Sequence, residues 1–309
     1  MATISGLHHV TAICDTAGQN IAFYADLLGL RLVKRTVNFD APDSYHLYYG
    51  DEIGRPGTLV TFFAWPDAPQ GRLGTGQVES IAFAVPPDSL GYWADRLERR
   101  GIDAEEIERF GDRLLRFHGP DALRLELVAA DAEGGSDPWS EGPVGSKDAI
   151  RGLSGVTLGV EGYERTTDLL ETMGYDPVGE EHDRFRYEAN GDVGSVLDVR
   201  CRPDLRSGRI GIGSVHHVAF RTEDGASQEE WREVLTEHGL DVTPVLDRTY
   251  FESIYFREPG GVLFEVATDG PGFTVDEPEG SLGEDLQLPE WLEPRRAEIE
   301  RDLPMIFYR

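Results

Sequence analysis

Apolar and polar residues follow one arrangement that recurs four times along the chain. Four segments carry apolar residues at positions i, i+3 or i+4, and i+7, and each ends at a glycine, which predicts four amphipathic helices closed by a left-handed residue. These segments are NIAFYADLLGL (20–30), YWADRLERRGI (92–102), TTDLLETMGY (166–175) and EEWREVLTEHGL (229–240). Before the helices stand four runs typical of β-strands: HHVTAI (8–13), SIAFAV (80–85), GVTLGV (155–160) and HHVAFR (216–221).

Strand-like runs also follow each helix, so the repeating unit is β-α-β-β-β. In the first unit they include YHLYYG (45–50) and TLVTFFAW (58–65), and in the fourth SIYFRE (253–258) and GVLFEVAT (261–268). A single unit would leave one face of a curved sheet open, so the units are expected to pair. We therefore predict an α+β fold in which four βαβββ modules pair into two domains of curved mixed sheets.

The division into domains follows from where the repeats and the loop-like residues lie. Residues 1–145 contain the first two modules and residues 151–270 the other two. Between them, residues 131–146 are rich in Gly, Pro, Ser and acidic residues and resemble a linker. Residues 271–309 are predicted to form a C-terminal arm with a helix within 288–303, and this arm offers a way for two copies to associate as a homo-oligomer.

The strongly acidic composition restricts the kinds of partner that the protein can bind and indicates the environment in which it functions. The 309 residues include 57 acidic and 29 basic side chains, for a net charge of −28. Such a surface repels phosphate, which argues against nucleic-acid and anionic-membrane partners. It is typical of proteins from high-salt organisms, because at 1 M salt the Debye length is about 3 Å and self-repulsion is screened.

The remaining composition points to the cytoplasm. No apolar run approaches the roughly 18 residues of a membrane-spanning helix, and no basic region followed by an apolar stretch opens the chain. The two cysteines, Cys14 and Cys201, are too few for a disulfide framework.

Two histidine pairs are the first candidates for chemistry. His8 and His9 begin the first module, and His216 and His217 begin the fourth. Alternation along a regular strand places His9 on one face with Thr11, and His8 on the other face, unless the strand is irregular there. One isolated histidine is more often a hydrogen-bonded core residue than a ligand, but a repeated pair favours a metal.

Glu265 supplies the carboxylate that completes this site. It lies in an apolar strand-like run, where an unpaired carboxylate would be costly to bury. Glu126 occupies the corresponding position of the second module, which has no histidine at its start, so we expect Glu126 to be salt-bridged or solvated. His9, His217 and Glu265 together form the two-histidine, one-carboxylate set that suits non-haem Fe(II), and Mn(II) accepts the same ligand types. Because His9 comes from the first module and the other two from the fourth, the two halves of the chain should meet over the metal.

These segments together resemble the vicinal-oxygen-chelate superfamily, which includes glyoxalases, bleomycin-resistance proteins and extradiol dioxygenases. Within it the chain is similar to ring-cleaving dioxygenases that act on hydroquinones, including (chloro)hydroquinone 1,2-dioxygenases. The resembling stretches span nearly the whole chain: GLHHVTAI, FYADLLGLRLVKRTVNFD, YHLYYGDEIGRPGTLVTFF, GSVHHVAFR, DRTYFESIYFREPGGVLFEVATDGPGF and WLEPRRAEIE.

The resemblance implies an extradiol-type ring-cleaving dioxygenase that takes a small aromatic diol and O₂. It implies that His9, His217 and Glu265 are the ligands of Fe(II). It also implies that five other residues line the substrate pocket: His8, Thr11, His216, Arg248 and Tyr255. Of these, His8, His216, Arg248 and Tyr255 are also the implied catalytic residues, through proton transfer by a histidine, charge stabilisation by the arginine and hydrogen bonding by the tyrosine.

Other interpretations of the same residues stay open at this point. Arg248 could pair with Glu252, Tyr255 could be a core residue, and His46 is more typical of an ordinary strand position than of a cavity. A metal-dependent glyoxalase-like isomerase or lyase would use the same scaffold but usually requires a second carboxylate, and the sequence alignment places Phe62 there. A non-catalytic module that binds aromatic compounds is the third alternative, although it has no need of two histidine pairs.

Overall fold

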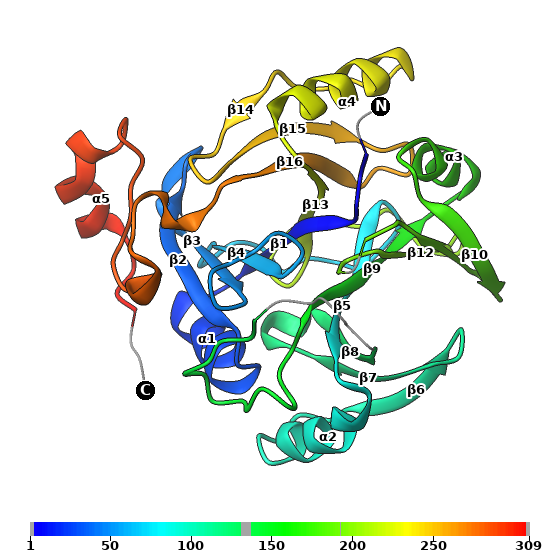
Figure 1. Ribbon diagram of the computed structural model, residues 1–309, viewed down its shortest axis with the longest axis horizontal. Coiled ribbons are helices and arrows are strands. Elements are labelled where there is room, and N and C mark those ends of the chain that lie inside the picture. Colours follow the sequence, from blue (N-terminus) through cyan, green and yellow to red (C-terminus); the bar gives the residue numbers. More distant parts are fainter. Residues whose placement is uncertain (1–2, 131–136, 192, 307–309) are drawn as a thin grey trace.

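The computed structural model describes residues 3–130, 137–191 and 193–306, which form two curved eight-stranded sheets side by side (Figure 1). The first sheet carries the strands of modules one and four. Its strands, in spatial order, are β14 (Leu246–Asp247), β15 (Phe251–Arg257), β16 (Leu263–Pro271), β13 (Val215–Thr222), β1 (Leu7–Cys14), β4 (Leu59–Ala64), β3 (Ala41–Gly50) and β2 (Arg31–Asn38).

The second sheet carries the strands of modules two and three in the same arrangement. Its strands, in spatial order, are β10 (Asp176–Glu181), β11 (Arg184–Glu188), β12 (Val196–Cys201), β9 (Gly152–Val160), β5 (Gln77–Val85), β8 (Arg124–Ala129), β7 (Asp112–His118) and β6 (Glu105–Arg109). Each sheet mixes parallel and antiparallel neighbours, so the predicted α+β fold of four βαβββ modules in curved mixed sheets is confirmed.

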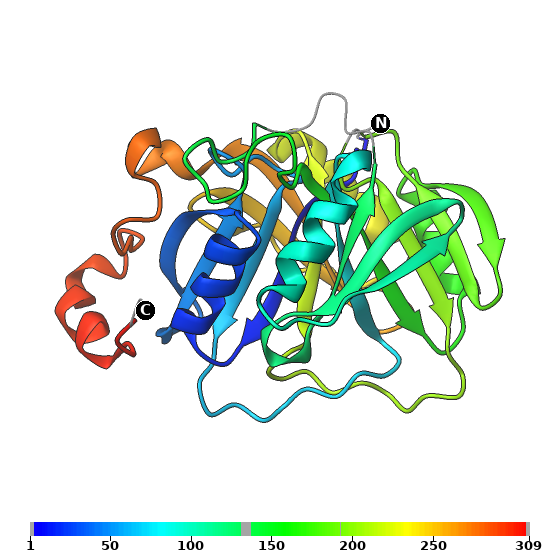
Figure 2. The same ribbon diagram turned by 90° about the horizontal axis from the view of Figure 1, so that it is seen from below.

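The sequence led us to expect that the modules would pair within each half of the chain, but in the structure they pair across the two halves and within the middle of the chain. β1 of module one pairs with β13 of module four, and β5 of module two pairs with β9 of module three. The first strand of every module has one free edge of similar pattern, so the repeat alone does not determine which two edges join. The chain crosses between the sheets through residues 65–76 and 202–214, which run together along one side of the molecule (Figure 2). The six residues 131–136 of the predicted linker lie outside the described residues.

All four helices predicted to close with a glycine are present, and each glycine follows two or three residues after the last helical residue. The main helices are α1 (Ala17–Ile21), continued by a π-helical segment η1 (Ala22–Leu27), α2 (Leu90–Glu98), α3 (Glu164–Thr172), α4 (Gly225–Glu237) and α5 (Arg296–Asp302). The shorter turns are η2 (Pro87–Ser89), η3 (Pro120–Ala122), η4 (Phe273–Val275), η5 (Glu279–Ser281) and η6 (Glu293–Arg295). The glycines have φ values of 73° (Gly29), 72° (Gly101), 90° (Gly174) and 79° (Gly239), as left-handed helix ends require.

Two glycines test this conformational argument with the same substitution. An added Cβ would meet no atom within 4 Å at either Gly91 or Gly239, but Gly239 has φ 79° whereas Gly91 lies inside helix α2. We expect Gly239→Ala to lower the free energy of unfolding by about 1 kcal/mol and Gly91→Ala to raise it by about 0.5 kcal/mol. Urea unfolding of the two variants would check the opposite signs, and destabilisation of equal size in both would contradict the argument.

The core and the candidate site occupy different faces of the first sheet. One face of β1, β4 and β13 packs into the main hydrophobic core through residues such as Val10, Phe62 and Phe220. The alternate residues point to the opposite face, where His9, His217 and Glu265 lie. None of the helices in the described parts of the chain combines the length and apolar character needed to span a lipid bilayer.

Candidate metal centre

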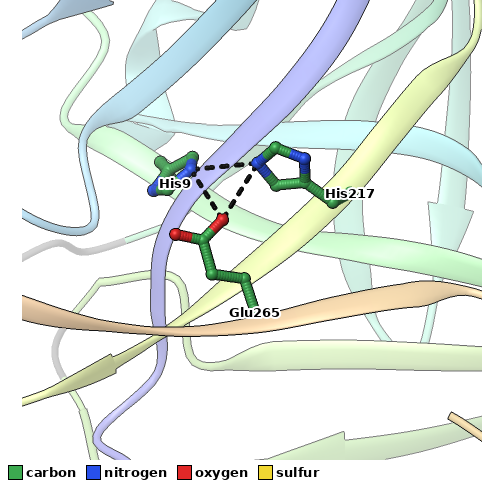
Figure 3. Close-up of side chains that lie close together, drawn as sticks. All are labelled: His9, His217 and Glu265. Atoms are coloured by element: carbon green, nitrogen blue, oxygen red, sulfur yellow. Dashed lines mark hydrogen bonds and ion pairs between the residues drawn. The ribbon is translucent and has the colours of Figure 1, made fainter. Parts of the chain in front are cut away.

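Three buried side chains converge from three neighbouring strands of the first sheet (Figure 3). His9 lies on β1, His217 on β13 and Glu265 on β16. The Nε2 atoms of the two histidines are 3.3 Å apart, and Glu265 Oε2 is 3.4 Å from His9 Nε2 and 3.0 Å from His217 Nε2. Among the described residues these side chains form a group whose ligand atoms lie within 4.8 Å of one another. These are the three residues that the sequence analysis predicted as metal ligands.

Glu265 is held so that one oxygen faces the histidines. Its Oε1 accepts a hydrogen bond of 2.5 Å from the buried Ser253 hydroxyl, while Oε2 is buried without a hydrogen-bond donor. Although burial acts to raise the pKa of Glu265, the neighbouring His9 and His217 hold it well below its usual value. The carboxylate is therefore charged, and a buried charge of this kind needs a cation.

The two histidine pairs occupy β-bulges, which explains how consecutive side chains come together. The register of β1 against β13 shifts between Leu7 and His9 and again between Thr11 and Ala12, so His8 and His216 are the extra residues of their strands. His8 Nδ1 lies 2.9 Å from His9 Nδ1, and His216 Nδ1 lies 2.8 Å from His217 Nδ1. The strand irregularity that the sequence left open is present in both copies.

This contact fixes which nitrogen of each ligand faces the carboxylate. A neutral imidazole has one donor and one acceptor nitrogen, so a proton on Nδ1 of His9 or His217 is donated to the preceding histidine and leaves Nε2 free to bind a metal. Burial lowers the pKa of His217, which favours the neutral form that ligands require. With Nδ1 protonated in both histidines, two nitrogen acceptors and one carboxylate oxygen would face one another, and this donor set fits a divalent metal such as Fe(II) or Mn(II).

A cavity of about 300 Å³ opens beside the candidate ligands, with His9 and His217 in its lining. Most of its walls are aromatic side chains and imidazoles, and the charged residues are confined to Arg248 and Asp40. The full set of lining residues is His9, Asn38, Phe39, Asp40, His46, Tyr48, Phe63, His216, His217, Arg248, Phe251, Tyr255 and Leu263. Its size and apolar character suit one aromatic ring with small substituents.

Three of the five predicted pocket residues line this cavity. His216, Arg248 and Tyr255 do so, and Arg248 Nε donates a hydrogen bond of 3.3 Å to the Tyr255 hydroxyl. Burial lowers the pKa of His216 to about 3, so this imidazole is neutral. Arg248 pairs with Asp40 at 3.2 Å rather than with Glu252, the alternative that the sequence suggested.

His8 and Thr11 are placed differently from the expectation that they line the pocket. Both are buried: His8 lies one contact behind the cavity wall, against His9, and Thr11 lies two contacts behind it, against Thr61, which in turn contacts the lining residue His46. Burial holds the pKa of His8 well below its usual value. The bulges shift the two histidine pairs differently relative to the opening, so His216 reaches the cavity while His8 is covered by Phe251, whose ring centroid is 4.9 Å away.

His46 lines the cavity, contrary to the strand role expected for it. Its Nε2 lies 2.8 Å from the Thr61 hydroxyl and its Nδ1 lies 3.0 Å from the Tyr48 hydroxyl. Alternation along β3 puts His46 and Tyr48 on the same face, which is the signal that could have identified both. Ser253 was also missed, although it alternates with Tyr255 on β15 beside the Glu265 strand.

The second carboxylate of a glyoxalase-type site is absent from the corresponding position of module one. β1 pairs with β4 through Thr11 and Thr61, as β13 pairs with β16 through Ala219 and Glu265. The counterpart of Glu265 is therefore Thr61, one residue from the Phe62 that alignment on the turn proline indicated. Phe62 instead faces the core, 4.4 Å from the Tyr24 ring.

Glu126 forms part of an ion-pair cluster in the second sheet. Arg109 binds it with two hydrogen bonds of 2.8 and 2.9 Å, and both side chains are buried. The salt-bridged role predicted for Glu126 is confirmed. The same strand position thus holds a candidate metal ligand in one sheet and an arginine partner in the other.

Comparison with known proteins agrees with this geometry. The model of the "Glyoxalase/Bleomycin resistance protein/Dioxygenase superfamily" matches the chain twice, at residues 6–127 and 145–266. The chain belongs to this superfamily. Each matched stretch spans two of the four βαβββ modules.

Several relatives within the superfamily carry names that concern aromatic rings. "Putative ring-cleaving dioxygenase MhqO" of Bacillus subtilis (strain 168) is 47% identical over 96% of this chain and 95% of its own. "Chlorohydroquinone/hydroquinone 1,2-dioxygenase" of Sphingobium indicum is 35% identical over 97% of this chain and 96% of its own.

Solved structures of superfamily members show the same fold. The crystal structure of a "putative dioxygenase" from Bacillus subtilis aligns with a TM-score of 0.96 at 45% identity, covering 100% of this chain and 99% of that one. Glyoxalase I from Zea mays aligns with a TM-score of 0.62 at 17% identity, over 85% of this chain and 92% of its own, and shares the fold alone.

Proposed function

We propose that this protein is a non-haem Fe(II)-dependent dioxygenase that opens the ring of a hydroquinone-type aromatic diol. The observation that carries the proposal is the His9, His217 and Glu265 group at the base of a ring-sized cavity. A relative named putative ring-cleaving dioxygenase, 47% identical, and one named chlorohydroquinone/hydroquinone 1,2-dioxygenase, 35% identical, both match nearly the whole chain and support the same chemistry. Mn(II) uses the same ligand types, and iron is favoured here because the reaction requires O₂.

Bound Fe(II) would supply a redox-active centre with positions left over for an organic oxygen and for O₂. The rest of the proposed chemistry belongs to the side chains of the cavity. Phe63, His46 and Phe251 provide aromatic surfaces between which a ring can lie. Arg248 and Tyr255 stand together on one side, where they can hydrogen-bond a ring hydroxyl or stabilise its anion.

The histidines beside the candidate ligands would play separate roles. With a metal on Nε2 of His217, its Nδ1 proton would be donated to His216 Nδ1, 2.8 Å away, and a neutral His216 would then carry its own proton on Nε2 and could donate a hydrogen bond toward the cavity. His8 does not reach the cavity and would orient the His9 ring, while Thr11 would orient His46 through Thr61. The expected product retains every atom of the diol and gains both atoms of O₂. The bond between a hydroxyl-bearing ring carbon and its neighbour breaks, and these two carbons become a carboxylic acid and an aldehyde.

Oxygen uptake tests this proposal against the alternatives. The protein would be reconstituted anaerobically with Fe(II), mixed with hydroquinone, methylhydroquinone or catechol, and followed with an oxygen electrode. We expect uptake in proportion to ring opening with at least one hydroquinone. No uptake with any diol, together with turnover of a thiol hemithioacetal, would favour the isomerase alternative, and tight diol binding without turnover would favour a binding module.

A further inference from the structure

The cavity carries one cationic side chain, and that charge is already matched. Among the lining residues of the described chain, Arg248 is the only arginine or lysine and Asp40 the only aspartate at the rim. Arg248 Nη1 donates a 3.2 Å hydrogen bond to Asp40 Oδ2, and its Nε donates to Tyr255. A ligand that reaches Arg248 therefore meets a guanidinium whose charge is shared with a carboxylate.

Asp40 is held at the rim by contacts that involve the two residues before it. It forms, with Phe39, the two-residue turn between β2 and β3, and its backbone N–H donates a 3.0 Å hydrogen bond to the Asn38 side chain. The Phe39 ring packs edge-on against Trp291 of the C-terminal arm, with ring centroids 5.6 Å apart. Module one thus places a negative charge beside the arginine of module four.

We propose that Asp40 determines specificity, by making the cavity select uncharged diols over diols with an anionic substituent. The proposal rests on the function proposed above and names the substrate class for the same site. A ring carboxylate or sulfonate near Arg248 would be repelled by Asp40 and would compete with it for the guanidinium. A neutral hydroxyl can use the remaining N–H donors of Arg248 without displacing Asp40.

The effect should be modest in size because Asp40 is exposed. Its side chain is 77% exposed and that of Arg248 is 20% exposed. We expect removal of this one charge to change discrimination about fivefold, as for other exposed charge pairs.

Two ligands of nearly equal shape isolate the charge. Hydroquinone sulfonate carries a permanent negative charge, and methylsulfonyl hydroquinone is a neutral molecule of similar size. Anaerobic calorimetry of the Fe(II)-loaded protein gives the ratio of their dissociation constants without any turnover. The variants are Asp40→Asn and, as a control, Asp43→Asn, which removes the same charge from an exposed position of the same hairpin outside the cavity lining.

We expect the unaltered protein to bind the neutral ligand more tightly, Asp40→Asn to reduce the preference about fivefold, and Asp43→Asn to leave it unchanged. Equal preferences in the two variants, or no preference in the unaltered protein, would overturn the proposal. Oxygen uptake with unsubstituted hydroquinone, measured in parallel, reports separately on the proposed function.

Discussion

Glu265→Gln is expected to abolish metal binding, lowering affinity for the metal by at least about 100-fold, since changes to groups behind the ligands already cost 10- to 100-fold. The amide keeps the size of the side chain but loses the negative charge that two neutral imidazoles and a divalent cation require. Metal analysis after dialysis, and calorimetric titration with Mn(II) as an O₂-stable probe, would measure the loss.

Glu126→Gln is the matched control, at the corresponding strand position of the second sheet. This variant should keep its metal but lose about 3 kcal/mol of unfolding free energy, because it removes the carboxylate that binds the buried Arg109 most closely and leaves only Asp198, 3.7 Å away. The two substitutions are chemically identical and should have opposite consequences. Equal metal retention in both would contradict the assignment of Glu265 as a ligand.

Lys34→Met is expected to lower the free energy of unfolding by about 3–5 kcal/mol, the usual result of removing one partner from a buried ion pair. The Lys34 side chain is completely buried and contacts Asp276 at 2.5 Å and also Glu277. Its ammonium group lies 5.1 Å from the centre of the Tyr250 ring. Without the lysine, the carboxylate of the buried Glu277 would remain uncompensated.

The effect should extend to the cavity, because this cluster joins the C-terminal arm to its wall. The Tyr250 hydroxyl donates a 3.0 Å hydrogen bond to Asp276, and its ring packs against Tyr48, which lines the cavity. Lys34→Met should therefore also weaken hydroquinone binding.

The other lysine of the chain provides the comparison. Lys147 is 87% exposed, so Lys147→Met should change stability by less than about 0.5 kcal/mol. Urea unfolding would measure both variants. Adding Glu277→Gln to Lys34→Met should recover part of the loss, and if the double variant were less stable than the single one, the cluster would not act as described.

The sequence was sufficient for features that depend on local pattern. Helix periodicity and the terminal glycines located four modules, because a left-handed residue at a helix end selects glycine wherever it occurs. The candidate ligands were also found, since His9 and His217 lie near the start of the first strands of modules one and four and Glu265 lies in an apolar run that forms the last strand of module four. The predicted meeting of the two halves of the chain over these residues agrees with the pairing of β1 and β13.

What the sequence missed depends on contacts between distant segments. The pairing of module one with module four cannot be deduced from four similar strand edges. The bulges in β1 and β13 cannot be predicted without knowing which strand each one pairs with, so the different positions of His8 and His216 were not foreseen. Asp40 reaches Arg248 across 208 residues of sequence, a separation at which nothing in the local pattern connects them.

The most direct test of the proposed ring cleavage is incorporation of labelled oxygen. Fe(II)-reconstituted protein would convert hydroquinone under ¹⁸O₂. The product would be reduced at once with borohydride, to prevent exchange of the aldehyde oxygen with water, and its mass would be measured by mass spectrometry. The account predicts an opened ring that carries two labelled oxygen atoms, with no product from Glu265→Gln. A product with an intact ring, or one labelled only when the water is labelled, would contradict it.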